Sequence, residues 1–243
     1  MSDAYTTFEI SDPPEGGDDQ AGGANNTGNA SARANGSIDP GAGTTTKRRR
    51  FEPIRLDAIH IDDGAVYAID GILPVGPAFG LTVGLPKSLK SFLLMRAGLC
   101  IAAGLPFAGR KVKQGAVVYI TSEGIRGVKR RLIAMRKALG LEGKNIPFFL
   151  VPAMPNLGTG TDDLKVLIAE IEKALAGCGY ALAMVVIDTV RRATPGKDEN
   201  SAKDIGGYVQ NVDAIATRFR CVVMSVHHSP RGGEGRGSGF ECA

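Results

Sequence analysis

Residues 84–91 read Gly84-Leu85-Pro86-Lys87-Ser88-Leu89-Lys90-Ser91, and this stretch decides the fold. The apolar run 79–83 precedes it and predicts a short buried strand, and residues 92–103 follow it and predict a helix. A strand, a turn that ends in Lys-Ser and a helix form the layout of a phosphate-binding P-loop. In that layout, backbone N–H groups and the positive end of the helix dipole surround phosphate oxygens.

The motif assigns a role to two side chains and raises a question about a third. Lys90 is expected to reach the β- and γ-phosphates of ATP, and the Ser91 hydroxyl to ligate Mg²⁺. The pattern G-x-x-x-x-G-K-[ST] has glycine where this chain has Leu89. Glycine there permits unusual dihedrals and keeps a Cβ away from the phosphates, so Leu89 is expected to narrow the cradle or distort the loop. The alternative interpretation is a chance strand-turn-helix that contains Lys-Ser.

The first 50 residues differ in composition from the rest of the chain. They are rich in Gly, Asn, Ala, Ser, Thr and Asp and contain almost no aliphatic side chains, which predicts a disordered tail. The segment ends in the basic cluster Lys47-Arg48-Arg49-Arg50, which fits either contact with nucleic acid or a solvated charge run. Residues 51–243 are predicted to form one folded domain, incomplete at its C-terminus.

Net charge, cysteine spacing and hydropathy bear on the partners, the thiol state and the location expected of this protein. The net charge of +4 permits nucleic-acid binding but does not demand it. The four cysteines are scattered without a C-x-x-C pair, which favours reduced thiols. Neither a secretory signal nor an apolar run of membrane-spanning length is visible, so we expect a cytoplasmic protein without a membrane partner.

The remaining apolar segments predict alternating strands and helices. Residues 51–75 and 190–200 are expected to be irregular, the latter as a polar loop. An alternating order with near-continuous apolar strands predicts an α/β fold, a mostly parallel sheet with helices on both faces. The expected strands are 116–120, 147–151, 182–187 and 221–226, and the expected helices are 128–139, 161–176 and about 201–219.

Polar side chains follow three of these strands, at the sheet edge where ligands bind in such folds. Glu123 is placed to orient or deprotonate an attacking water, and Asp188 to hold Mg²⁺. His227 and His228 are candidate sensors of the γ-phosphate. The alternative for Glu123 is an exposed loop carboxylate, and the alternative for Asp188 is a side chain that caps a turn. One of the two histidines has a purely structural role in the alternative interpretation.

Basic residues occupy two of the expected loops. Arg191 and Arg192 follow the strand that ends in Asp188, and Arg231 and Arg236 lie in a Gly-rich segment. These four are candidate contacts to a DNA backbone, or to a phosphate across a subunit boundary. A solvated polar loop is the alternative.

Taken together, the ordered motifs resemble the RecA-like P-loop ATPases of the RepA-type replicative helicase group, found on plasmids, phages and integrated elements. The resemblance covers about residues 70–239. The segments that carry it are Gly84 to Ser91, Val117 to Gly124, Val185 to Thr189, Asp198 to Ser201 and Val226 to Ser229.

The resemblance implies a RecA-like core and, typically, a hexameric ring that hydrolyses ATP with Mg²⁺ and moves along single-stranded DNA. It implies that Lys90 and Ser91 are Walker A residues, Glu123 the catalytic glutamate and Asp188 the Walker B aspartate. His227 and His228 match the segment thought to link the γ-phosphate to DNA loops. The chain departs from the family at Leu89 and at its end, where the family usually continues into further strands.

Two hypotheses from different classes follow. The first is a motor ATPase, namely a DNA helicase of a mobile-element or plasmid replication module. The second is a catalytically silent nucleotide- or DNA-binding remnant of that family. A small-molecule kinase shares the P-loop, and DNA-stimulated ATP turnover separates the motor from both others.

Overall fold

The computed structural model describes residues 53, 55–58, 67–198 and 201–229. Residues 1–59 and 60–243 form two separate units. The first contributes a short 3₁₀ helix, Leu56–Ala58. The predicted tail of residues 1–50 lies outside the described residues, so that domain assignment stays a prediction.

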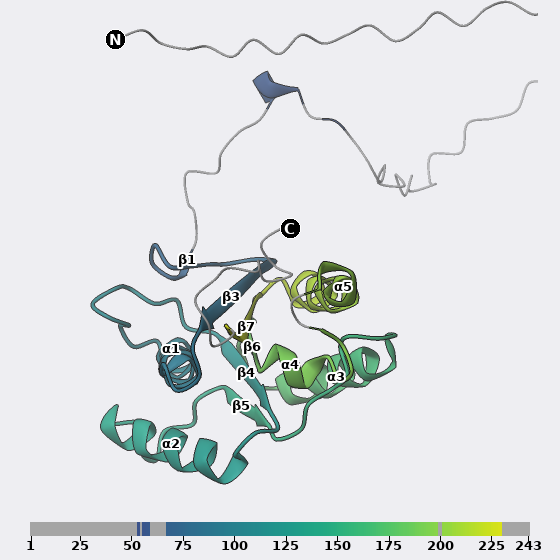
Figure 1. Cartoon of the computed structure of the whole chain (residues 1–243). Coiled ribbons are helices and arrows are strands. Elements are labelled where there is room, and N and C mark those ends of the chain that lie inside the picture. Colours follow the sequence, from purple (N-terminus) through teal and green to yellow (C-terminus); the bar gives the residue numbers. More distant parts are fainter. Residues whose placement is uncertain (1–52, 54, 59–66, 199–200, 230–243) are drawn as a thin grey trace, which may run out of the picture. The chain divides into compact units, whose positions relative to one another are not determined.

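A parallel sheet of five strands forms the centre of the second unit (Figure 1). Its order is β3 (Ala78–Gly84), β7 (Val222–His228), β6 (Leu182–Asp188), β4 (Ala116–Thr121) and β5 (Phe148–Val151). The register sets Thr121 beside Asp188 and Gly84 beside His228. All the carboxyl ends of the strands therefore point to one edge, where the P-loop also lies.

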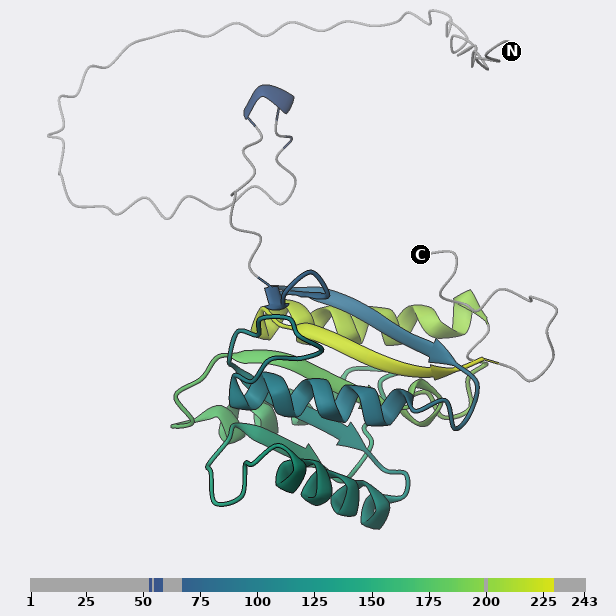
Figure 2. The same cartoon turned by 90° about the vertical axis from the view of Figure 1, so that its left-hand side faces the viewer.

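Helices cover both faces of the sheet, as the sequence predicts. α1 (Lys90–Ala103) and α2 (Ile125–Ala138) lie on one face, and α3 (Asp162–Leu175), α4 (Val190–Ala193) and α5 (Ala202–Phe219) on the other (Figures 1 and 2). The α/β prediction is confirmed: the fold is a RecA-like P-loop core.

Two apolar clusters, one on each face, hold the layers together. Strand residues alternate between them: Val118 and Ile120 pack with the α3 to α5 cluster, and Val117 and Tyr119 with the α1 and α2 cluster. Every residue of β4 is buried. A strand buried on both faces needs a continuous apolar sequence, which is why the strands were visible as apolar runs.

Two segments that the sequence predicts as irregular contain regular structure. The polar loop 190–200 begins with α4, in which Val190 and Ala193 are buried. The segment 51–75 contains a small antiparallel pair, β1 (Tyr67–Ile69) and β2 (Leu73–Pro74). Elements of two to four residues are too short to show a hydrophobic period, so the sequence could not reveal them.

The helix ends match the predicted signals in part. Ser201 caps α5, because its Oγ accepts a hydrogen bond from the Asp204 amide at 3.4 Å. Thr161 is the N-cap residue of α3, but its side chain makes no capping hydrogen bond. α2 begins at Ile125, three residues before the predicted start. Among the described helices, none is long and apolar enough to cross a membrane.

Candidate nucleotide site

Lys90 lies inside its own loop, at the first position of α1. Its Nζ donates hydrogen bonds to the carbonyl oxygens of Gly84 (2.6 Å) and Leu85 (2.8 Å) and to Ser88 Oγ (3.3 Å). Burial lowers the pKa of the Lys90 ammonium, and the nearby Asp188 carboxylate opposes that shift. The loop thus surrounds the buried ammonium group of Lys90, and the positive charge of that group suits a phosphate ligand.

Leu89 adopts the conformation that the motif demands of glycine. Its φ is +64° and ψ is +14°, which is left-handed, and it stands at the N-cap of α1. Its side chain is 70% exposed. The loop therefore makes a left-handed turn at Leu89 at the cost of strain in a non-glycine residue.

Replacing Leu89 with glycine is expected to stabilise the chain by about 1 kcal/mol. The left-handed penalty of roughly 1–2 kcal/mol disappears, offset in part by the greater backbone entropy that glycine loses on folding. Urea unfolding of the two chains measures the difference. Leu89→Ala is the matched control, because it removes the exposed side chain but keeps the Cβ. An equal gain in both variants would contradict the backbone explanation.

Asp188 ends β6 and is almost fully buried, with 6% of its surface exposed. The phenol of Tyr119, on the neighbouring strand β4, donates a hydrogen bond of 2.6 Å to Asp188 Oδ2. Sequence reasoning missed Tyr119, since a tyrosine within an apolar strand looks like a core residue. The only sequence signal for it is its position two residues before the strand end.

Glu123, just beyond the end of β4, forms an ion pair with an arginine from the opposite side of the sheet. Arg192 Nε donates to Glu123 Oε1 at 2.5 Å, and both side chains are about half exposed. Arg192 belongs to α4, directly after Asp188. The structure thus joins the predicted catalytic carboxylate to a predicted DNA-contact residue, a link that the sequence did not suggest.

Neighbouring loops hold α4 in place. The amides of Leu157 and Gly158 donate to the Ala193 carbonyl at 2.8 and 3.1 Å. Thr194 Oγ1 donates to the Val190 carbonyl at 3.0 Å. The position of Arg192 is therefore set by buried backbone contacts.

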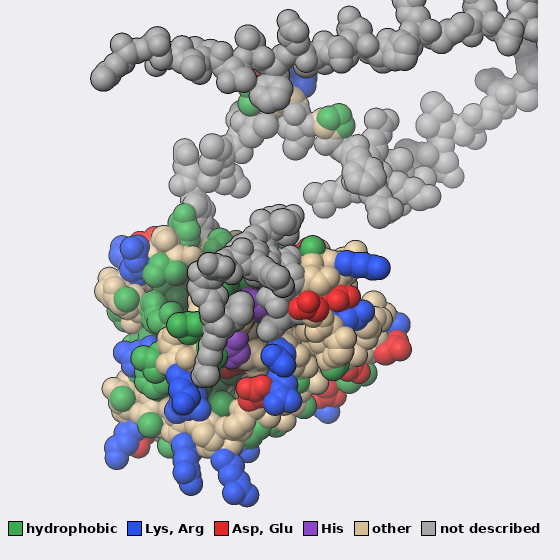
Figure 3. Space-filling model, viewed as in Figure 1, with side chains coloured by type: hydrophobic (Ala, Val, Ile, Leu, Met, Phe, Trp, Pro, Cys, Tyr) green, Lys and Arg blue, Asp and Glu red, His purple; other side chains and the backbone are tan. Residues whose placement is uncertain are grey.

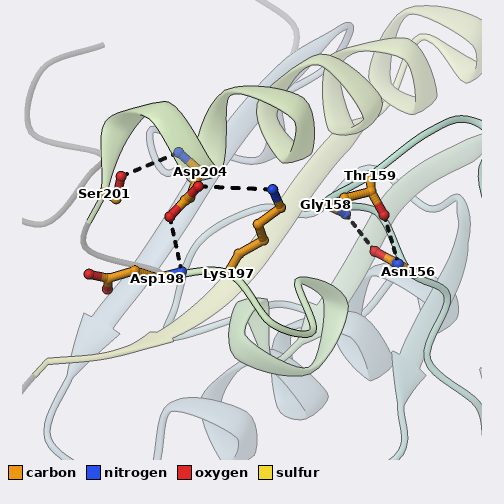
Figure 4. A network of polar contacts seen from close by, with 7 residues as sticks. All are labelled: Asn156, Gly158, Thr159, Lys197, Asp198, Ser201 and Asp204. Atoms are coloured by element: carbon orange, nitrogen blue, oxygen red, sulfur yellow. Dashed lines mark hydrogen bonds and ion pairs between the residues drawn. The ribbon is translucent and has the colours of Figure 1, made fainter.

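Figure 4 shows the polar contacts on either side of α4. Asp204, in the first turn of α5, accepts from the Asp198 amide at 3.4 Å and pairs with Lys197 at 3.9 Å. Asn156 Oδ1 accepts from the Gly158 amide at 3.1 Å, and Asn156 Nδ2 donates to Thr159 Oγ1 at 2.9 Å. These contacts fix the turns that flank the helix.

The two histidines at the end of β7 have different surroundings. His227 is buried, with 1% of its surface exposed, and does not line the cavity at the P-loop. His228 lines that cavity, and its Nδ1 is buried without a hydrogen-bond partner among the described residues. Adjacent strand residues face opposite ways, so only His228 is placed to contact a ligand there.

A cavity of about 580 Å³ lies at the carboxyl ends of the strands and brings most predicted site residues together. Gly84 and Leu85 do not line it but hold Lys90. Arg191 and Arg192 lie outside its lining, although Arg192 reaches it through Glu123, and Arg231 and Arg236 lie outside the described residues. The lining is Pro86, Lys87, Ser88, Leu89, Lys90, Ser91, Phe92, Thr121, Glu123, Gly124, Val128, Arg131, Asp188, Thr189 and His228.

The donor set fits Mg²⁺ held together with a nucleotide. Among the described residues, no cluster of three or more His, Cys, Asp or Glu side chains is arranged to hold a metal ion. Magnesium is commonly bound by one or two carboxylates together with substrate phosphates and waters. The Asp188 carboxylate and the Ser91 hydroxyl supply hard oxygen ligands beside the cradle for phosphates.

A comparison with protein families matches residues 64–234 to AAA_25, described as an AAA domain. The chain belongs to this AAA domain family. The match spans β1 through the end of β7, so it includes every described residue that lines the cavity. Membership of the AAA domain family supports nucleotide binding and ATPase activity in general. The comparison with curated proteins gives no match.

Proposed function

We propose that this AAA domain protein is a RecA-like motor ATPase that hydrolyses Mg-ATP and acts on single-stranded DNA, as a helicase of a mobile-element or plasmid replication module does. One observation carries the proposal. A single cavity is lined by Lys90, Ser91, Glu123, Asp188 and His228, which come from the P-loop and three other segments.

Each of these side chains has a task in phosphoryl transfer. Lys90 binds the β- and γ-phosphates, and Ser91 and Asp188 would hold Mg²⁺, which neutralises phosphate charge when bound. Glu123 orients the attacking water and accepts its proton. His228, whose Nδ1 has no partner among the described residues, is the candidate hydrogen-bonding contact to the γ-phosphate.

Two basic surfaces support contact with a polyanion. Arg191 and Arg192 are exposed on α4. α2 carries six exposed Lys or Arg side chains and no acidic side chain. The positive charge on this one helix is therefore larger than the net charge of the whole chain, which is +4. Figure 3 shows blue side chains along the lower edge of the view, where Figure 1 places α2. Such a surface attracts nucleic-acid backbones in a salt-dependent way.

The ion pair between Glu123 and Arg192 suggests how DNA would stimulate turnover. While Arg192 is paired with Glu123, the Oε1 atom of that carboxylate accepts from the guanidinium and is not available to an attacking water. A DNA phosphate that takes over Arg192 would release Glu123 for the attacking water. A hexameric assembly, which the family resemblance implies, and a cytoplasmic location, which the sequence favours, remain part of the proposal.

Arg192→Ala is therefore expected to raise ATP turnover without DNA several-fold and to abolish stimulation by single-stranded DNA. Arg218→Ala is the matched control, since Arg218 forms a similarly exposed ion pair with Glu172, between α5 and α3. Steady-state ATPase assays with and without a DNA oligonucleotide measure both effects. Unchanged DNA stimulation in Arg192→Ala would refute this coupling.

The proposal as a whole is tested by the same assay on the unaltered chain. Turnover of Mg-ATP that single-stranded DNA stimulates, and that rising salt reduces, is the expected result. Nucleotide binding without turnover under every condition would favour the catalytically silent remnant. Turnover that requires a small phosphate acceptor, and not DNA, would favour a kinase.

A further inference from the structure

Tyr119 lies beside Asp188, one of the two residues proposed to hold magnesium. Its phenol donates a hydrogen bond of 2.6 Å to Asp188 Oδ2. Tyr119 lies on β4 and Asp188 on β6, so this phenol connects two neighbouring strands at the edge of the nucleotide cavity.

The direction of this hydrogen bond follows from counting protons. A carboxylate that binds a cation only accepts, so the single phenol proton goes to Asp188 Oδ2. Asp188 keeps its second oxygen, Oδ1, for the cation.

The surroundings keep this phenol fixed. The Tyr119 ring is fully buried and stacks on Phe148, with ring centroids 6.4 Å apart. A side chain held on all sides can hold its partners in one orientation.

We propose that Tyr119 is a positioning residue of the magnesium site, orienting the Asp188 carboxylate toward the cation. This inference rests on the proposed Mg-ATP site. Hydrogen-bonding partners of this kind fix metal ligands, and their loss typically weakens metal affinity about 10–100-fold.

A second tyrosine in the same chain provides a matched control. Tyr208 is also fully buried, and its hydroxyl forms a 2.6 Å hydrogen bond with Ser225, but Ser225 does not line the nucleotide cavity, whereas Asp188 does. Tyr→Phe at either position keeps the ring and removes one buried hydrogen bond. Similar losses of melting temperature are therefore expected, and a purely structural role would make the two variants behave alike.

The experiment measures binding of a fluorescent ATP analogue to the full chain, first in EDTA and then during a MgCl₂ titration. In Tyr119→Phe, affinity in EDTA is expected to stay unchanged, while the Mg²⁺ concentration at the midpoint rises about 10-fold. Tyr208→Phe should keep the wild-type midpoint. Adding Tyr119→Phe to an Asp188→Asn chain should produce no further shift, because the phenol acts through that carboxylate.

Three results would overturn the inference: a Tyr119→Phe midpoint equal to or below the wild-type value, the same shift in Tyr208→Phe, or a further shift in the double variant. Failure of the proposed function looks different. In that case the unaltered chain itself shows no binding of the analogue, or binding that does not respond to Mg²⁺.

Discussion

Glu123→Gln is expected to lower ATP turnover on the order of 10²–10⁴-fold while ATP binding persists. Glutamine has nearly the same shape as glutamate but cannot accept the proton of the attacking water. Glu123 lines the cavity yet lies apart from the P-loop that holds the phosphates. Loss of the base should therefore lower kcat and leave the nucleotide affinity near that of the unaltered chain.

Quenched-flow or steady-state ATPase assays, paired with equilibrium binding of ATP, measure the two effects separately. Glu172→Gln is the control, since Glu172 also accepts from an exposed arginine but belongs to α3, outside the cavity lining. Turnover by Glu123→Gln close to that of the control would show that another group activates the water.

Lys90→Ala is expected to remove both binding and turnover. Lys90 is the buried cation of the loop, and its ammonium bonds the carbonyls of Gly84 and Leu85. On binding, that ammonium would exchange these carbonyls for phosphate oxygens. Loss of one preorganised hydrogen-bond donor typically costs on the order of 10²–10³-fold in kcat, and weaker phosphate binding adds to this.

Lys90→Arg tests whether charge alone is enough. Guanidinium is planar and larger than ammonium, so it does not fit among two carbonyls and the Ser88 hydroxyl. We expect Lys90→Arg to fail as fully as Lys90→Ala in calorimetric ATP titrations. Wild-type affinity in either variant would mean that the phosphates bind elsewhere.

The sheet and its helices could be predicted from sequence because burial on both faces imposes continuous apolar strands, such as β4 and β6. The positions of Lys90, Asp188 and Glu123 at strand ends followed from the same pattern. Since the carboxyl ends of parallel strands share one edge, the sequence also predicted that these side chains would gather there.

The side-chain contacts within the site could not be predicted from the sequence, for a physical reason. Tyr119 and Asp188 lie 69 positions apart, as do Glu123 and Arg192. Each pair forms only because β4 and β6 are neighbours in the sheet. The hydrophobic period of a single segment does not predict the order of strands in a sheet. Leu89 is a different case: the sequence showed the anomaly, but only the backbone showed that leucine accepts a φ of +64° there.

The most direct test of the account is calorimetric titration of the purified full chain with ATP, in the presence and absence of Mg²⁺. The account predicts one ATP per chain, binding that Mg²⁺ strengthens, and loss of that binding in Lys90→Ala. A folded chain that binds no ATP under either condition would contradict the assignment of residues 84–91 as a working P-loop.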